Sequence, residues 1–367
     1  MNREDKILEE SNLKNKSDRG FHVSPEILYS FGAVALALLI NAVIIALQGV
    51  SPLKAYQVLW KGAFGSKNAV AETLLRATPL ALVGLGVCAA FRASVFNVGT
   101  EGQIFIGGTV AAVIALALPD LPQVLLIPLM CIAGMAAAAL LGSISIFLKL
   151  KYNANEMINT IMTNYVVIYL VSWLVHGPIQ QPGSPLGQTD KFSRNGILPR
   201  LIPRTRLHVG FVVLLILVVI TYILLEKTVW GYQIKVTGKN LDASKAAGIR
   251  VKRVFYSAMI YSGAMAGLAG VFEASGVQNR MIENLSSGYG YTGIVVALLG
   301  QLNPVGVLFA AVLFGALQVG ASSMETMLKI PSSAVSMIQY LIVIIFLGKN
   351  AFPRLWKRIR GSREEKA

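Results

Sequence analysis

The chain has 367 residues, 54% hydrophobic and only 14% charged, with a mean hydropathy of +0.61. A soluble domain carries roughly a quarter charged residues, so this composition excludes an ordinary soluble protein. The net charge is +15, but the basic residues lie between apolar runs and near the C-terminal end, which indicates membrane topology and lipid contact rather than nucleic-acid binding.

Apolar runs near the roughly 20 residues needed to cross a bilayer recur along the chain, and they predict an all-α, polytopic integral membrane protein. The polar residues 1–28 predict a cytoplasmic N-terminal tail rather than a cleaved signal peptide, because the apolar run after them is long. The basic residues 349–367 predict a second cytoplasmic tail. About ten spans are expected in 29–348, at 29–50, 77–91, 104–118, 123–148, 157–176, 208–225, 254–273, 290–301, 303–322 and 334–348.

Loop charges suggest the side on which each connection lies. The semi-polar stretch after the first span favours an interfacial helix on the outer side. The segment 226–253 is rich in lysine and arginine and is therefore expected in the cytoplasm. The Pro- and Gly-rich loop 177–207 carries five basic residues, yet the span count places it outside, and we follow the count.

Small residues crowd the spans, and Gly263 and Gly267 form a GxxxG pair. Such residues let helix backbones approach closely in a membrane, so tight packing is the favoured interpretation and direct solute contact the alternative. The cysteines, Cys88 and Cys131, lie inside apolar runs and are expected to be packing residues.

The stretch "NVGTEGQ" places Asn97, Glu101 and Gln103 between two short apolar segments. Broken helices are tolerated in membranes where they are buried in protein or line a wet cavity, and they mark transporter sites. The alternative is an ordinary turn whose polar groups cap helix ends. Both interpretations remain open from the sequence.

The fifth span opens with Asn155 and Glu156 and contains Asn164 two turns later. Capping explains the first two as well as a solute pathway does. Polar side chains at membrane depth usually face the bundle interior, so Asn164 is expected either to bond a neighbouring helix or to line the pathway.

A second interrupted stretch, "GYGYTGIVVALLGQLNPVG", occupies a similar place in the second half of the chain. Such pairs suggest an internal repeat with the pathway at its interface. Tyr289 and Tyr291 could stack on a nucleobase or sugar, although interfacial anchoring is the commoner role of tyrosine.

The segment 231–253 is unusually polar and small-sided. Asn240 is a good helix N-cap, and Gly248 fits the position after a helix end. Ala243, Ala246 and Ala247 would then share one face of a short helix. A small-residue face with charged flanks could seat in a groove of a partner; a plain positive-inside connector is the alternative.

Catalytic motifs are absent from the sequence. The three histidines form no HExxH motif or Cys/His cluster, no serine lies in a GxSxG turn, and no P-loop is present. We therefore expect no enzymatic activity, no metal site and no cofactor on this chain, with any ATP hydrolysis carried by another subunit.

Four ordered stretches together resemble one family: "FNVGTEGQIFIGG" (96–108), "NANEMINTIMTNYV" (153–166), "TGKNLDASKAAGI" (237–249) and 288–317. They resemble permeases of bacterial ABC importers for branched-chain amino acids, ribose-type sugars and nucleosides. The likeness is strongest to the longer permease of nucleoside and simple-sugar systems. It covers nearly all of 77–348.

The resemblance implies a subunit of the bacterial plasma membrane that pairs with a second permease. It further implies cytoplasmic ATPases and an extracellular substrate-binding lipoprotein. Nucleosides are the expected solute, with ribose-type sugars or branched-chain amino acids as alternatives. An ion-coupled carrier is the rival of another class, disfavoured because carboxylates lie near span ends. The implied coupling helix docks on the ATPase and includes Gly238, Asn240, Ala243, Ala246, Ala247 and Gly248.

Overall fold

The computed structural model describes residues 25–331 and, beyond them, 333, 337, 339–341 and 344–345. The chain divides into two units, one formed by 45–336 and the other by 1–44 together with 337–367. The described part of the unit formed by 1–44 and 337–367 is chiefly the apolar helix α2 (Pro25–Leu47), whose last residues belong to the other unit. The predicted tails 1–28 and 349–367 lie outside the described residues, apart from 25–28 at the start of α2.

The unit 45–336 is built from helices, and its described residues pair as strands only at isolated bridges, so the all-α prediction is confirmed. A short 3₁₀ turn, η1 (Arg194–Gly196), interrupts the loop 177–207, and a π-helical turn, η2 (Glu273–Gln278), extends α11. The α-helices are α3 (Pro52–Phe64), α4 (Lys67–Arg92), α5 (Thr100–Ala117), α6 (Gln123–Tyr152), α7 (Glu156–Val175), α8 (Gly210–Lys227), α9 (Val229–Lys239), α10 (Leu241–Ala246), α11 (Val251–Phe272), α12 (Tyr289–Leu299) and α13 (Pro304–Leu328).

Seven helices among the described residues are long and apolar enough to cross a membrane, or eight if one bent pair counts as a span. The expected span 290–301 is α12, with 11 residues. At about 1.5 Å per residue it is roughly 16 Å long, about half of a bilayer core. Much of the expected last span, 334–348, falls on residues outside the described ranges. The fold class is thus confirmed, whereas the count of ten spans is not.

Short polar side chains explain why several helices begin where they do. Asn155 caps α7 by accepting hydrogen bonds from the backbone N–H groups of the first turn, and Ser66, Thr228 and Asn303 do the same for α4, α9 and α13. Each cap satisfies donors that the first helical turn leaves free. These starts therefore follow from local sequence alone.

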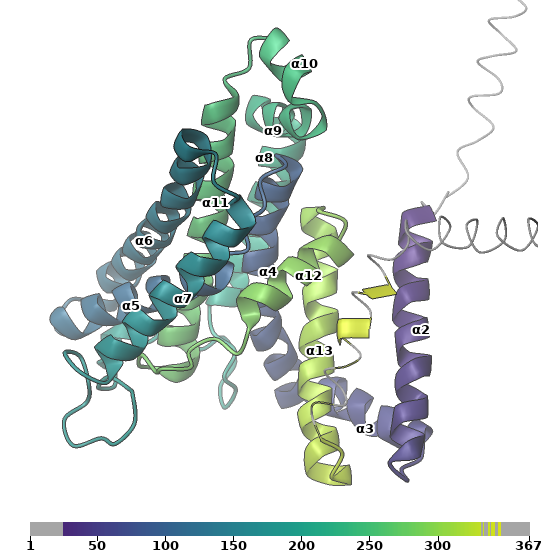
Figure 1. Ribbon diagram of the computed structural model, residues 1–367. Helices are drawn as coiled ribbons and strands as arrows, with labels where there is room; N and C mark the ends of the chain where they lie inside the picture. The colour runs from purple at the N-terminus through teal and green to yellow at the C-terminus, as the bar shows by residue number, and fades with distance from the viewer. Residues whose placement is uncertain (1–24, 332, 334–336, 338, 342–343, 346–367) are drawn as a thin grey trace, which may run out of the picture. The chain divides into compact units, whose positions relative to one another are not determined.

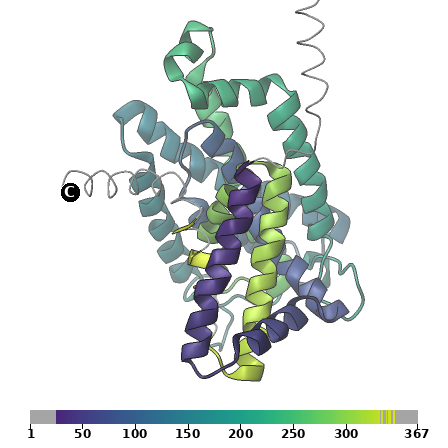
Figure 2. The same ribbon diagram turned by 90° about the vertical axis from the view of Figure 1, so that its right-hand side faces the viewer.

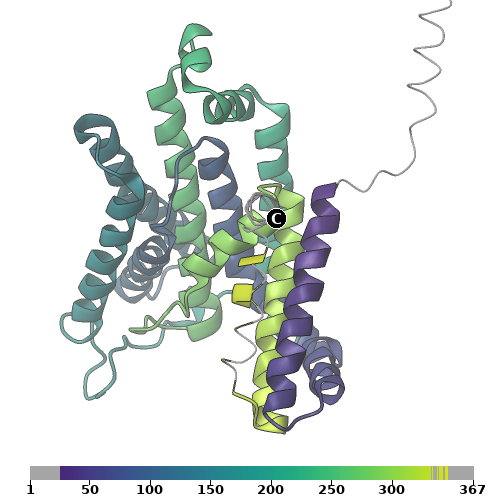
Figure 3. The same ribbon diagram turned by 45° about the vertical axis from the view of Figure 1, so that its right-hand side comes forward.

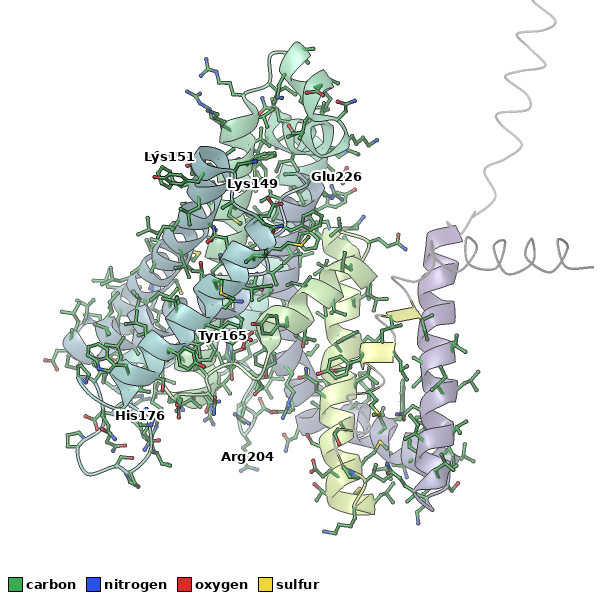
Figure 4. All side chains as sticks on the ribbon, in the orientation of Figure 1. Lys149, Lys151, Tyr165, His176, Arg204 and Glu226 are labelled. Atoms are coloured by element: carbon green, nitrogen blue, oxygen red, sulfur yellow. The ribbon has the colours of Figure 1, made fainter. Side chains whose placement is uncertain are left out.

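The two ends of the unit 45–336 differ in what they carry (Figures 1 and 4). Lys149, Lys151 and Glu226 lie near the end that bears α10, whereas His176 and Arg204 lie at the opposite end. We name these the α10 end and the loop end. The loop 177–207 therefore lies at the end opposite to α10. The side of the membrane on which each end lies stays a prediction.

The loop 177–207 is held against the helices by its backbone. The N–H groups of Thr189, Phe192 and Leu198 donate to the carbonyls of Met281, Asn279 and Ser275 at 2.9, 2.9 and 3.1 Å. Phe192 and Leu198 are themselves buried. The irregular segment is thus a fixed part of the loop end.

Just beyond this loop, His208 is almost fully buried. Burial lowers the pKa of its imidazole to about 4. The ring is therefore neutral near pH 7, and its Nδ1 accepts a hydrogen bond from the N–H of Gly210 at 3.1 Å. This bond fixes the entry into α8.

Helix α11 packs between α4, α5 and α6, and glycines make this close packing possible. A Cβ added to Gly263 would lie 2.6 Å from the carbonyl oxygen of Ala138, and one on Gly267 would lie 2.7 Å from that of Gly134. Both contacts are with the backbone of α6. The packing interpretation of this GxxxG pair is confirmed.

Gly263→Ala is expected to lower the free energy of unfolding by about 1–3 kcal/mol, since the methyl group would push α11 away from α6. Thermal unfolding of the detergent-solubilised protein measures this. Gly32→Ala in α2 is the matched control, because a Cβ there meets nothing within 4 Å. Equal midpoints for the two variants would contradict the packing argument.

Candidate functional site

Helix α5 begins inside the protein. After α4 ends at Arg92, the chain runs without helical structure through 93–99 before α5 starts at Thr100. Asn97 lies in this segment with its side chain fully buried, and its Oδ1 accepts a hydrogen bond from the N–H of Gly99 at 3.0 Å. Non-helical backbone at membrane depth requires such internal partners.

Asn97 also joins this segment to two helices. Its Nδ2 donates to Oε1 of Gln103 on α5 and to Oγ of Ser262 on α11, each at 2.9 Å. All three side chains are buried. Two of the polar groups predicted in "NVGTEGQ", Asn97 and Gln103, are therefore partners of each other, and α11 supplies Ser262 as the third member.

Asn164 makes a second set of bonds. Its Oδ1 accepts from the N–H of Gly102 at 2.8 Å, and its Nδ2 donates to the carbonyl of Val98 at 2.9 Å and to the hydroxyl of Tyr291 at 3.3 Å. A Cβ on Gly102 would lie 2.9 Å from Asn164 Oδ1, so glycine permits the approach. The predicted interhelical bond is present; a pathway role is compatible with it.

The starts of the two interrupted helices meet. Glu101 Oε2 accepts from the N–H of Gly290 at 2.7 Å, and Thr100 Oγ1 donates to the Gly290 carbonyl at 3.1 Å. Gly288, just before α12, has φ +82°, a conformation that favours glycine. The Glu101 carboxylate thus lies at the N-termini of both α5 and α12, where the helix dipoles favour negative charge.

The two predicted tyrosines differ in exposure. Tyr289 is only 8% exposed, whereas Tyr291 is 40% exposed and touches Asn164 through its hydroxyl. Only Tyr291 therefore presents much of its ring outside the fold. We define the α5–α12 network as the interconnected residues Asn97, Thr100, Glu101, Gln103, Asn164, Ser262 and Tyr291.

Thr100 and Ser262 of this network were missed in the sequence. Serine and threonine are common in membrane helices, where they often bond their own backbone, so neither residue type signals a site by itself. Their position within stretches that already contained buried amides and glycines was the available clue.

Asn155 and Glu156 lie apart from this network. Asn155 caps α7, accepting from the N–H groups of Met157 and Ile158 at 3.0 and 3.3 Å. Glu156 pairs with Lys149 of α6 and accepts from the N–H of Phe96 at 3.3 Å. The structure thus places both at the α10 end, with partners that stabilise the α6–α7 connection.

A polar hairpin, formed by α9 and α10, projects at the α10 end. Figures 2 and 3 show α9 lying crosswise between the ends of α8 and α11, with α10 beyond it. We name residues 229–248 the docking hairpin, after the role that the sequence resemblance implied for this segment. Helix α10 thus contacts chiefly α9 and the start of α11, and it projects beyond the other helices.

Helix α10 has the local features expected from the sequence. Asn240 Oδ1 accepts from the N–H groups of Asp242 and Ala243, both at 3.0 Å, and Gly248 has φ +74°. Of the helix's small residues, Ser244 is buried against the chain. The alanines of the predicted face are exposed: Ala243, Ala246 and Ala247.

Gly238 explains how the hairpin joins the bundle. A Cβ at this position would overlap the carbonyl oxygen of Arg92 at the end of α4. The Gly238 carbonyl also accepts a hydrogen bond from Oγ of Ser94 at 2.8 Å. The hairpin backbone therefore rests directly on the segment that leads to α5.

The described residues contain no group of three or more His, Cys, Asp or Glu side chains placed to hold a metal ion. The arrangement offers two things: an internal network between interrupted helices, and a projecting hairpin tied to it. Neither contains a nucleophile paired with a base. The arrangement is therefore suited to binding and to conformational change.

Comparison with known proteins assigns the family. Residues 69–347 match the family described as the permease component of the branched-chain amino acid transport system. The guanosine ABC transporter permease protein NupP of Bacillus subtilis (strain 168) is 35% identical over 321 residues, 87% of this chain and 92% of NupP. The chain belongs to this permease family. It is thus a multi-pass subunit of the plasma membrane, as the resemblance implied.

Other relatives also match this permease over most of its length. The nucleoside ABC transporter permease protein NupB of Lactococcus lactis subsp. cremoris (strain MG1363) is 34% identical, with 93% of this chain and 97% of NupB covered. The glucose ABC transporter permease protein TsgB13 of Haloferax volcanii is also 34% identical, covering 88% and 87%. A second guanosine permease of B. subtilis, NupQ, matches at 26% over 78% and 93%.

Proposed function

We propose that this permease forms the solute pathway of an ATP-driven importer for nucleosides. The named solutes of NupP and NupB support that class, and TsgB13 makes a simple sugar the second candidate. The observation that carries a pathway role is the contact between the starts of α5 and α12 at Gly290. Interrupted helices that meet inside a transporter are typical of solute sites.

The α5–α12 network suits a nucleoside chemically. Tyr291 exposes an aromatic ring on which a base could stack, and Asn164 holds its hydroxyl in place. A small rotation of α12 relative to α5 would free the Glu101 carboxylate and the Thr100 hydroxyl, which both now bond Gly290. Those groups could then bond ribose hydroxyls or base edges.

The proposed partners are a second permease, cytoplasmic ATPases and an extracellular lipoprotein. A second permease is proposed because NupP and NupQ are two permeases that bear the same transporter name in one organism. Less than a third of the residues in the apolar 18-residue stretch of each of α6, α7 and α8 are buried, which leaves apolar faces for that permease and for lipid. ATP would be bound and hydrolysed by cytoplasmic ATPases docked at α10, and an extracellular lipoprotein would deliver the solute.

The solute class is tested by uptake of labelled guanosine in cells with and without this permease. Unlabelled adenosine, guanosine and uridine are expected to compete better than ribose, glucose or leucine. A protonophore applied at constant cellular ATP is expected to leave uptake unchanged, since coupling is to ATP. Competition by leucine alone would refute the nucleoside assignment, and loss of uptake with the protonophore would favour an ion-coupled carrier.

A further inference from the structure

Arg92, the last residue of α4, makes an unusual set of contacts for a charged residue at a helix end. Its Nη1 lies 2.5 Å from Oε1 of Glu226, near the end of α8. Its Nε donates to the carbonyl of Leu302 at 2.8 Å. The side chains of Arg92 and Glu226 are only 16% and 25% exposed, so solvent screens the pair less than at an open surface.

The contacts of Arg92 hold the docking hairpin in place through Glu226 and Gly238. Glu226 Oε2 lies 3.8 Å from Nζ of Lys235 on α9. Two residues after Arg92, Ser94 donates to the Gly238 carbonyl, and Gly238 itself packs on the backbone of Arg92. The base of the hairpin is therefore bound to the end of α4 through charge, hydrogen bonds and close backbone contact.

The contacts of Arg92 also extend to the two interrupted helices, α5 and α12. Arg92 opens the segment 93–99, which carries Asn97 into the α5–α12 network. Leu302 belongs to the turn between α12 and α13, where Gln301 and Leu302 have φ +58° and +54°. The Arg92 guanidinium thus joins Glu226, at the base of the hairpin, to the turn after α12, and the Arg92 backbone leads directly into the segment before α5.

We propose that Arg92 is a positioning residue that transmits movement of the docking hairpin to the start of α5 and the end of α12. The inference rests on the proposed docking of the hairpin on an ATPase. A force on α10 passes through α9 to Glu226 and Gly238, then through Arg92 to 93–99 and Leu302. A basic residue that only complements the α4 dipole would need neither Glu226 nor Leu302.

The geometry also specifies arginine. The guanidinium donates in two directions at once, from Nη1 to a carboxylate and from Nε to a carbonyl. A lysine ammonium is a compact point charge on a flexible stem and lacks this fixed fork. Lysine at this position would keep the charge and the pairing with Glu226 but lose the planar link to Leu302.

The test compares Arg92→Met, Glu226→Gln and the double variant with wild type, each assembled in proteoliposomes with its second permease, ATPases and substrate-binding lipoprotein. Guanosine uptake per ATP hydrolysed is expected to fall about tenfold or more, because charge-assisted bonds are lost. ATPase co-purification is expected to be unchanged, since α10 is untouched. The double variant is expected to lose no more uptake per ATP than Arg92→Met alone, because the two residues act through one shared contact.

Lys151→Met is the matched control, because Lys151 is exposed at the same end and forms no ion pair within the described residues. Its uptake per ATP is expected to equal that of wild type. Arg92→Lys is expected to restore less than half of the lost coupling. Wild-type coupling in Arg92→Met, or loss of ATPase association in it, would overturn the inference.

A second measurement does not depend on the solute. Tyr291→Cys, in a chain with Cys88 and Cys131 replaced by alanine, is labelled with a maleimide in the assembled complex. ATP is expected to change the labelling rate when Arg92 is present and to have no effect in Arg92→Met. An ATP effect of equal size in both would refute the role of Arg92, whereas failure of guanosine uptake in wild type would refute only the nucleoside assignment.

Discussion

Ala246→Arg is expected to abolish import while the amount of permease in the membrane stays near that of wild type. Ala246 is exposed on α10 outside the helix bundle, so the permease itself can fold around a larger side chain. At a packed contact with an ATPase, an unpaired arginine would be desolvated, which costs about 2–5 kcal/mol. The affinity of the permease for the ATPase, measured by co-purification with tagged permease, is expected to fall by about 1.5 to 3.5 orders of magnitude, since every 1.4 kcal/mol is about tenfold.

Lys245→Gln serves as the control for this variant, because it changes charge on the same short helix. Lys245 is exposed and pairs with Asp242 at 3.3 Å, a surface contact that contributes little. Import is expected to remain within about twofold of wild type. If Ala246→Arg imported at the wild-type rate, α10 would be a connector and the docking proposal would fail.

Asn164→Leu is expected to produce the largest loss of stability among changes in the α5–α12 network. Leucine has the same branched arrangement of side-chain heavy atoms but leaves the Gly102 N–H and the Val98 carbonyl without their side-chain partner. Each unsatisfied buried group costs about 1–3 kcal/mol, so the unfolding free energy should fall by about 2–6 kcal/mol. The thermal unfolding midpoint in detergent measures the loss.

Tyr291→Phe is the matched control inside the same network. It removes one hydrogen bond of 3.3 Å at a side chain that is 40% exposed, so water can replace the lost partner. Its unfolding midpoint is expected to lie close to that of wild type. If Asn164→Leu unfolded at the same temperature as Tyr291→Phe, the network would not stabilise the start of α5.

Features set by neighbouring residues could be predicted from the sequence. The Asn240 cap, the positive φ of Gly248 and the irregular loop 177–207 all depend on side chains within a few positions. Helix α12 was mistaken for a full span because its composition is apolar. Its 11 residues suffice because its start is bonded to Glu101, almost two hundred positions earlier.

Partners that lie far apart in the sequence could not be predicted, because no local pattern indicates them. Ser262 is the acceptor for Asn97 although 165 positions separate them. Arg92 directly follows the expected span 77–91, where a basic residue already has a topological explanation, so no further role could be predicted for it. Its contacts with Glu226 and Leu302 arise from the packing of four helices, which no local pattern contains.

The charge of the loop 177–207 has a consequence for how the chain is made. With the docking hairpin in the cytoplasm, as proposed, this loop must be translocated across the membrane with a net charge of +4, from five basic residues and Asp190. Against an inside-negative potential of about 100 mV this costs roughly 9 kcal/mol, at about 2.3 kcal/mol per charge. The backbone bonds to Met281, Asn279 and Ser275 form only after α11 is inserted, and they then hold the loop where its charge alone would not keep it. The loop 177–207 should therefore reach its final position only after the second half of the chain has been inserted and has formed these backbone bonds.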